Sequence, residues 1–218
     1  MSTKIKKATT PEEINVIDQF NTFWIANRKT IYATLIILII AVGSFVVIRQ
    51  QKLQAKAEAK NAFQMALATN LNNPSALLMA MQQVADEYAT SEYGAYASFL
   101  IANQNLNENN PEAALPWFDK ALNGTTKGTF VYAETIEGRG VTLEALGRND
   151  EAMKEYIKVL ALKEGAHRYP AVSLKLALLY KTIGNNEAAV KQFKTTTTFE
   201  NTPVEIKALA EKEIAILQ

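Results

Sequence analysis

The most distinct hydrophobic pattern in the chain is an uninterrupted apolar run near the N-terminus. Residues 31 to 48 read IYATLIILIIAVGSFVVI without a charge, and Arg28, Lys29 and Arg49 flank them. As an α-helix with a rise of about 1.5 Å per residue, the run would extend about 27 Å, close to the ~30 Å hydrocarbon core of a bilayer. The pattern therefore predicts a transmembrane helix over 31–48.

Two other interpretations of this run remain open. A buried helix of a globular core is one, but such a helix rarely lacks a polar face over its whole length. A cleavable signal peptide is the other, because Ala41 and Gly43 before Ser44 loosely resemble a cleavage site. Against cleavage, the apolar run continues to Ile48, and the roughly thirty residues before it are long for the charged region of a signal peptide. We favour an uncleaved anchor.

The first thirty residues carry a weaker helical pattern. Thr10, Pro11 and Glu13 have the form of a capping-box helix start. Apolar residues then recur at helical spacing, at Ile14, Ile17, Phe20 and Trp24. We expect 1–30 to be a tail with a short amphipathic helix in the headgroup region, and a flexible tail is the alternative. Lys and Arg residues lie on both sides of the span, so charge leaves its orientation open.

Downstream of the span, the pattern changes to a series of helix-length segments. Residues 50–70 are rich in Ala, Lys, Gln and Glu. A second segment places four residues on one stripe, Leu77, Met81, Val84 and Tyr88. No strand alternation of comparable strength occurs, and the breaks with Asn, Gly or Pro fall between the segments. The pattern predicts an all-α domain over 49–218.

Three stretches of this domain share one layout. They align on Ala114, Ala152 and Ala189, which are 38 and 37 residues apart. In each stretch an aromatic residue follows the aligned alanine, at Phe118, Tyr156 and Phe193. The period is close to the ~34 residues of a tetratricopeptide repeat, in which two helices form a hairpin and the hairpins stack.

These stretches resemble the tetratricopeptide repeat most clearly from Pro170 to Phe193. The signature positions there are held by Leu176, Ala177, Tyr180, Gly184, Ala189 and Phe193. The resemblance implies small residues, such as Gly140 and Ala177, that let the two helices of a hairpin approach, a turn residue with positive φ, and aromatic side chains that fill the space between neighbouring repeats. Departures are Arg139 in place of Leu, Asn109 in place of the turn Gly, and Thr196 in place of Ala. A capping-box start at Thr202, Pro203 and Glu205 then predicts a C-terminal capping helix.

Composition narrows the function classes. The 23 Lys and Arg residues nearly balance the 22 Asp and Glu residues, so the chain lacks the basic field that attracts nucleic acid. It has no cysteine, and His167 is its only histidine, which excludes thiolate chemistry and a His–His metal pair. Gly138, Arg139 and Gly140 lack the strand and third glycine of a phosphate loop. We expect no enzymatic activity, cofactor, metal, small-molecule substrate or nucleic acid.

The concave side of such a solenoid is the candidate partner-binding surface, because the first helix of each hairpin lines it. Its expected members are Tyr96, Phe99, Asn103, Glu137, Val141, Glu144, Leu174, Leu178 and Lys181. This mixed, partly apolar surface suits an extended or helical segment of another protein. The alternative is that individual members only pack against neighbouring helices. Where tetratricopeptide domains grip a C-terminal carboxylate, this chain has mostly apolar or acidic residues, which argues against that activity.

The arrangement as a whole is similar to one bacterial family. The closest local similarity lies in Ser91 to Gln104 (SEYGAYASFLIANQ) and in Gly138 to Tyr156. With the tail, the single span and the divergent repeats, these segments resemble the ancillary subunit of the Sec translocon. The resemblance implies a bacterial inner-membrane protein with a cytoplasmic N-terminus and periplasmic repeats. It also implies contact with translocon subunits, chaperones or exported chains.

We therefore expect a membrane-anchored protein-binding scaffold with two kinds of partner, other proteins and the lipid bilayer. A structural assembly factor for an envelope or cell-division complex is the alternative, because it would use the same surface on a fixed partner.

Overall fold

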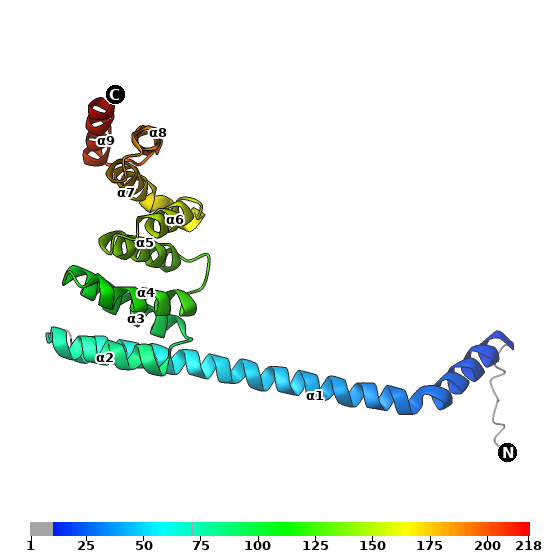
Figure 1. The fold of residues 1–218 in the computed structure, drawn as a ribbon. Helices are drawn as coiled ribbons and strands as arrows, with labels where there is room; N and C mark the ends of the chain where they lie inside the picture. Colours follow the sequence, from blue (N-terminus) through cyan, green and yellow to red (C-terminus); the bar gives the residue numbers. More distant parts are fainter. Residues whose placement is uncertain (1–10, 71) are drawn as a thin grey trace, which may run out of the picture. The chain divides into compact units, whose positions relative to one another are not determined.

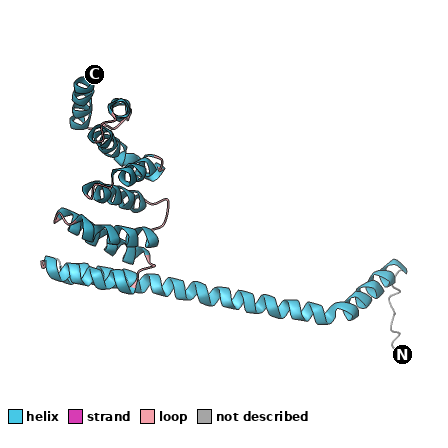
Figure 2. Ribbon diagram, viewed as in Figure 1, coloured by secondary structure: helices cyan, strands magenta, loops and turns pink. Residues whose placement is uncertain are grey.

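Every regular element that the structure describes is helical. The computed structural model describes residues 11–70 and 72–218 (Figures 1 and 2). The chain divides into two compact units, residues 1–54 and 55–218. The prediction of an all-α chain is confirmed.

The first helix, α1 (Pro11–Asn70), is 60 residues long and contains the whole apolar run. In the described part of the chain it is the one helix long and apolar enough to cross a membrane. The large apolar side chains of the run are exposed, with Ile36, Leu38 and Phe45 as examples. The expected boundaries at 30/31 and 48/49 fall inside this helix and stay predictions. The helix start expected at Thr10 lies outside the described residues.

Residues 55–218 form a stack of helices in which, from α2 onward, each element packs against the next (Figure 1). The elements after α1 are α2 (Pro74–Glu87), α3 (Glu92–Asn107), α4 (Pro111–Gly124), α5 (Phe130–Ala145), α6 (Asn149–Leu160), the 3-10 helix η1 (Lys163–Arg168), α7 (Tyr169–Thr182), α8 (Asn186–Thr198) and α9 (Val204–Leu217). Contacts between neighbours in the chain are the mark of a solenoid. The three aligned stretches become the hairpins α3–α4, α5–α6 and α7–α8.

Each of these hairpins turns on one residue with positive φ. The φ angles are 57° at Asn109, 72° at Gly147 and 80° at Gly184. Glycine adopts this region without steric cost and asparagine tolerates it better than other residues, so Asn109 preserves the turn. After the first and third turns, Asn110 and Asn185 cap the next helix by accepting a backbone N–H with their side chains. The helices of each hairpin are thereby connected by only a few residues.

Small residues in the first helices make room for aromatic rings from the second helices. A Cβ on Gly138 would lie 2.4 Å from the Phe118 ring, and a Cβ on Gly140 would lie 2.8 Å from the Tyr156 ring. Both rings and that of Phe193 are fully buried. Gly140 therefore lies where the two helices of one hairpin meet, as expected, and Phe118 packs between neighbouring repeats, whereas Tyr156 packs within its own hairpin.

The stack begins earlier than the three aligned repeats. Phe63 and Ala66, near the end of α1, are buried in one cluster with Met81 and Val84 of α2 and Ala97 of α3. The stripe expected on α2 therefore faces this cluster. The last turns of α1 belong to the repeat unit, which the comparison of repeats within the sequence did not detect.

The C-terminal helix α9 covers the end of the stack, as expected. It packs against α7 and α8, and Ala210 is fully buried. Its start differs from the prediction, because the helix begins at Val204 without a side-chain cap. The hydroxyl of Thr202 instead donates to the carbonyl oxygens of Thr196 and Phe199, at 3.0 and 2.8 Å, and ties the connection to the end of α8.

Candidate partner-binding site

Four of the nine expected surface residues line one cavity between α3 and α5. The cavity has a volume of about 320 Å³. Phe99 and Asn103 come from α3, and Glu137 and Val141 come from α5. The two helices are the first helices of successive hairpins and contact each other directly. The structure therefore brings these four residues together on one side of the stack.

Aromatic rings on α3 hold one side of this region in place. The rings of Tyr96 and Phe99 stack with centroids 6.1 Å apart and an interplanar angle of 16°. Behind them, Phe63 lies 5.4 Å from the Tyr96 ring, and Phe118 lies edge-on 6.2 Å from the Phe99 ring. Aromatic pairs attract at such separations. The two α3 rings are therefore supported from the core while they remain partly exposed.

An ion cluster around the buried carboxylate of Glu137 lines the cavity. Glu137 accepts hydrogen bonds from Nε and Nη2 of Arg168, both at 2.8 Å, and from Nζ of Lys175 at 2.7 Å. Burial raises the pKa of Glu137, but the hydrogen bonds from Arg168 and the charge of Lys175 outweigh burial, so the pKa lies below its ordinary value. Glu137 is ionised at neutral pH and fixes two cations that also line the cavity.

Tyr96 lines a second, more apolar cavity of about 230 Å³. The other lining residues are Glu92, Tyr93, Thr125, Thr129 and Val131. On α3 and on α5 these residues precede those of the first cavity, so the two cavities follow one another along the same pair of helices.

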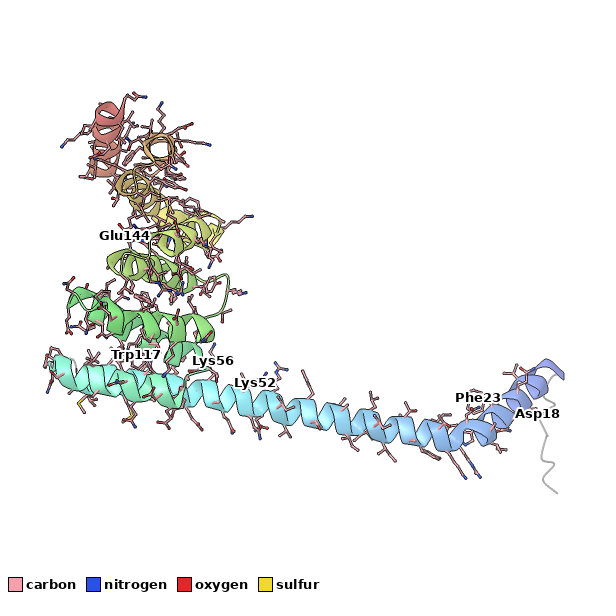
Figure 3. All side chains as sticks on the ribbon, viewed as in Figure 1. Asp18, Phe23, Lys52, Lys56, Trp117 and Glu144 are labelled. Atoms are coloured by element: carbon pink, nitrogen blue, oxygen red, sulfur yellow. The ribbon has the colours of Figure 1, made fainter. Side chains whose placement is uncertain are left out.

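Glu144 is engaged within its own hairpin. Its Oε2 atom accepts a hydrogen bond of 2.6 Å from the Tyr156 hydroxyl. Burial, followed by the hydrogen bond to Glu144, raises the pKa of Tyr156, so the hydroxyl keeps its proton and remains a donor. Figure 3 labels Glu144 on α5. Its carboxylate positions the buried Tyr156 ring and does not line either cavity.

The three expected residues on α7 lie against α9. Leu174 and Leu178 pack on the cluster around Phe193 and Ala210, and Lys181 forms an ion pair with Glu213 of α9. None of the three lines the cavity between α3 and α5. A terminal helix can pack on either side of the last hairpin, and the sequence pattern does not say which.

The structure adds five residues to the first cavity, Leu106, Glu134, Gly138, Arg168 and Lys175. The sequence did offer a signal for Glu134 and Gly138, because they share one helical face of α5 with Glu137 and Val141. Arg168 carried no such signal, because it lies in η1, 31 residues from Glu137 in the sequence. The neighbouring His167 is exposed, with Nε2 3.6 Å from Glu134. Among residues 11–70 and 72–218, no group of acidic or His side chains is placed to hold a metal ion.

Comparisons with known proteins agree with the repeat fold. Crystal structures of MamA align with TM-scores of 0.52 and 0.53, each at 19% identity. The first alignment covers 71% of this chain and 75% of that chain, and the second covers 75% and 86%. A structure of MamA AMB-1 aligns with a TM-score of 0.53 at 18% identity, over 69% of this chain and 78% of that chain. At such identities the likeness shows the fold alone.

Sequence profiles give the family. No curated protein sequence matches the chain. The profile of a tetratricopeptide repeat matches residues 133–165, which span α5, α6 and the connection into η1. The profile of a tetratricopeptide repeat-like domain matches residues 21–130, half of the chain. The chain therefore belongs to the tetratricopeptide repeat-like domain family.

Proposed function

We propose that the protein is a membrane-anchored scaffold that binds segments of other proteins. The observation that carries this proposal is the cavity between α3 and α5, where Phe99, Leu106 and Val141 form an apolar wall beside two fixed cations. Repeat solenoids use such extended surfaces to bind other proteins. Apolar contact area next to fixed polar groups suits a peptide segment, because the first supplies affinity and the second supplies orientation.

The apolar run of α1 supports the membrane anchor. Its large side chains are exposed, and transfer of apolar surface from water to hydrocarbon is favourable by about 25 cal/mol per Å². A helix also satisfies its own backbone hydrogen bonds, as a lipid environment requires. We assign residues 31–48 to a transmembrane helix, residues 1–30 to a tail with a short amphipathic helix, and residues 49–218 to the repeat domain.

Similarity to the ancillary subunit of the Sec translocon adds a location, an orientation and a set of partners to the proposal. On this basis the protein lies in a bacterial inner membrane, with its N-terminus in the cytoplasm and its repeats in the periplasm. Its partners are then translocon subunits, periplasmic chaperones or exported chains. Protease treatment of spheroplasts tests this topology. Digestion of the C-terminal domain is expected, and its protection from protease would reverse the orientation and discard the translocon assignment.

Crosslinking in cells tests partner binding. A photoreactive residue in place of Asn103, which lines the cavity, should capture a translocon subunit, a chaperone or an exported chain. The matched control is Lys154, an exposed residue on α6 outside both cavities. Equal capture from the two positions, or recovery of the protein alone, would contradict a binding role for the cavity. Capture of one fixed envelope or division protein would favour the assembly-factor alternative.

A further inference from the structure

The two cavities follow one another along α3 and α5, and we call the surface that they form together the crease. The α3 side consists of Glu92, Tyr93, Tyr96, Phe99, Asn103 and Leu106. The α5 side consists of Val131, Glu134, Glu137, Gly138 and Val141. Apart from the adjacent pairs Glu92–Tyr93 and Glu137–Gly138, the members of each set recur every three or four residues, so each set occupies one helical face. Each of the stacked rings of Tyr96 and Phe99 lines one of the two cavities, so the cavities are neighbours along α3.

The first end of the crease is apolar. The 230 Å³ cavity is lined by two tyrosine rings, Val131 and the two threonines of the α4–α5 connection. Among its described lining residues, Glu92 alone is charged. Glu92 already forms an ion pair of 3.1 Å with Lys56. This end therefore suits one large apolar or aromatic side chain.

The second end presents unused hydrogen-bond donors. Glu137 lies beneath Arg168 and Lys175, since its side chain is 6% exposed whereas theirs are 39% and 36% exposed. An arginine carries five N–H groups and a lysine three. Nη1 of Arg168 donates to no described residue, and Lys175 is bonded within the described chain to Glu137 alone. The cations are ordered, yet a partner can still reach their remaining donors.

These contacts favour an acidic ligand at the second end. Glu134 is the other carboxylate of this cavity, and it lies 3.6 Å from His167. A partner lysine would meet Glu134 while facing two fixed cations, whereas a partner carboxylate would meet the donors of both cations. Because Glu137 already holds these side chains, a ligand pays less entropy to order them.

We propose that the crease binds an acidic internal segment of a partner protein. An apolar side chain occupies the cavity beside Tyr93 and Tyr96, and an Asp or Glu side chain binds Arg168 and Lys175. The inference rests on the proposed function, because it specifies the partner chemistry of the same surface. The cavity centres lie roughly eight helical residues apart on α3, or about 12 Å at a rise of ~1.5 Å per residue. An extended partner covers this span with about four residues at ~3.3 Å each.

Peptide binding to the full-length protein in detergent micelles tests the inference. The probe is a fluorescent twelve-residue peptide with an amidated C-terminus, one Trp and one Glu four residues apart in a neutral polar background. We expect it to bind at least tenfold more tightly than the same peptide with Gln in place of Glu. Raising the salt concentration should reduce this preference, because part of it is electrostatic.

Variants of the protein test whether the preference for the Glu peptide arises at the cluster of Glu137, Arg168 and Lys175. The Arg168→Gln/Lys175→Gln/Glu137→Gln variant removes the cluster without leaving a buried carboxylate unpaired, and it should bind the Glu and Gln peptides equally. The matched control is Arg148→Gln/Lys158→Gln/Glu151→Gln, which changes the same residue types outside both cavities and should keep the preference. Circular dichroism checks that both variants remain helical. Loss of the preference in the control as well would overturn the assignment to this site.

Three other outcomes would overturn the inference. Equal binding of the Glu and Gln peptides by the unaltered protein would remove the acidic preference. Tighter binding of a Lys peptide would reverse it. If a Gln peptide with a free C-terminus matched the Glu peptide, the ligand would be a chain end and not an internal acid. In each case crosslinking from Asn103 could still capture a partner, because it tests partner binding and not partner chemistry. Failure of this inference is therefore distinguishable from failure of the proposed function.

Discussion

The same apolar residue types occupy opposite environments in the two units of the chain. Ile39 and Phe45 of α1 are exposed, whereas Phe118 and Phe193 of the repeats are fully buried. All four lie on helices, so helix formation does not explain the difference. The repeat helices keep a polar side, and neighbouring helices cover the apolar side. The run in α1 has no polar side. A single neighbouring helix would cover only one side of it, so we assign the run to lipid.

Removal of a buried aromatic ring should have the largest effect, a loss of stability of the repeat unit. Tyr156→Ala deletes a fully buried aromatic side chain and leaves Glu144 without its donor, so we expect a loss of about 3–5 kcal/mol in the free energy of unfolding. Urea unfolding of the full-length protein in detergent, followed by circular dichroism, measures it. The neighbouring Ile157 is exposed, and Ile157→Ala should change stability far less. Equal losses in the two variants would contradict the packing of the hairpins.

A charge placed in the apolar run should have the second-largest effect. Leu38→Lys places an ammonium group in the middle of the proposed span, which costs about 2.5–3.5 kcal/mol of insertion free energy. Carbonate extraction of membranes measures this, and more of the variant should appear in the soluble fraction. Gln64→Lys adds the same charge at an exposed position of α1 outside the span and should leave extraction unchanged. If both variants extract equally, the run does not differ from the rest of α1 in its environment.

Loss of the buried carboxylate should have a smaller, pH-dependent effect. The pKa of Glu137 is lowered by folding, so its stabilising contribution is present above the ordinary pKa of 4.5 and is lost as the pH falls through the folded-state value. Glu137→Gln should therefore cost about 1–3 kcal/mol of unfolding free energy at pH 7, and the cost should shrink as the pH falls below 4.5. Denaturation midpoints between pH 7 and pH 3 measure it. A difference that is constant across this range would show that the ionised cluster does not stabilise the fold.

Loss of a surface ion pair should have the smallest effect on stability, and it serves as the control for Glu137→Gln. Glu151 also has a lowered pKa, because Arg148 donates hydrogen bonds to it, but both groups are open to solvent. Water screens such pairs, so Glu151→Gln should leave the unfolding free energy nearly unchanged at every pH. A loss as large as that of Glu137→Gln would mean that burial does not distinguish the two carboxylates.

The parts of the fold that sequence predicted are those fixed by neighbouring residues. The turns at Asn109, Gly147 and Gly184 depend on which residues tolerate positive φ, and the helix faces depend on residues three and four positions apart. Phe99, Asn103, Glu137 and Val141 line one cavity in the structure, and their helix faces follow from this periodicity, whereas their role in partner binding stays a prediction.

Contacts between distant segments were beyond the sequence pattern. Arg168 and Lys175 reach Glu137 across 31 and 38 residues, and this depends on where η1 directs the chain after α6. Leu174 and Leu178 were expected on the partner-binding surface, with packing against neighbouring helices as the alternative, and in the structure α9 packs beside them. Arg139, which departs from the repeat signature, is likewise explained by partners outside its own helix, Asp119 on α4 and Glu155 on α6.

Cysteine labelling in native membranes tests the central comparison most directly, because the chain contains no cysteine of its own. Ile39 in the apolar run and Met79 on α2 are 69% and 72% exposed, so the fold alone shields neither. In opened membranes, a water-soluble maleimide should label Met79→Cys and leave Ile39→Cys unlabelled until detergent is added. Equal labelling of the two positions before detergent would contradict the assignment of the run to lipid.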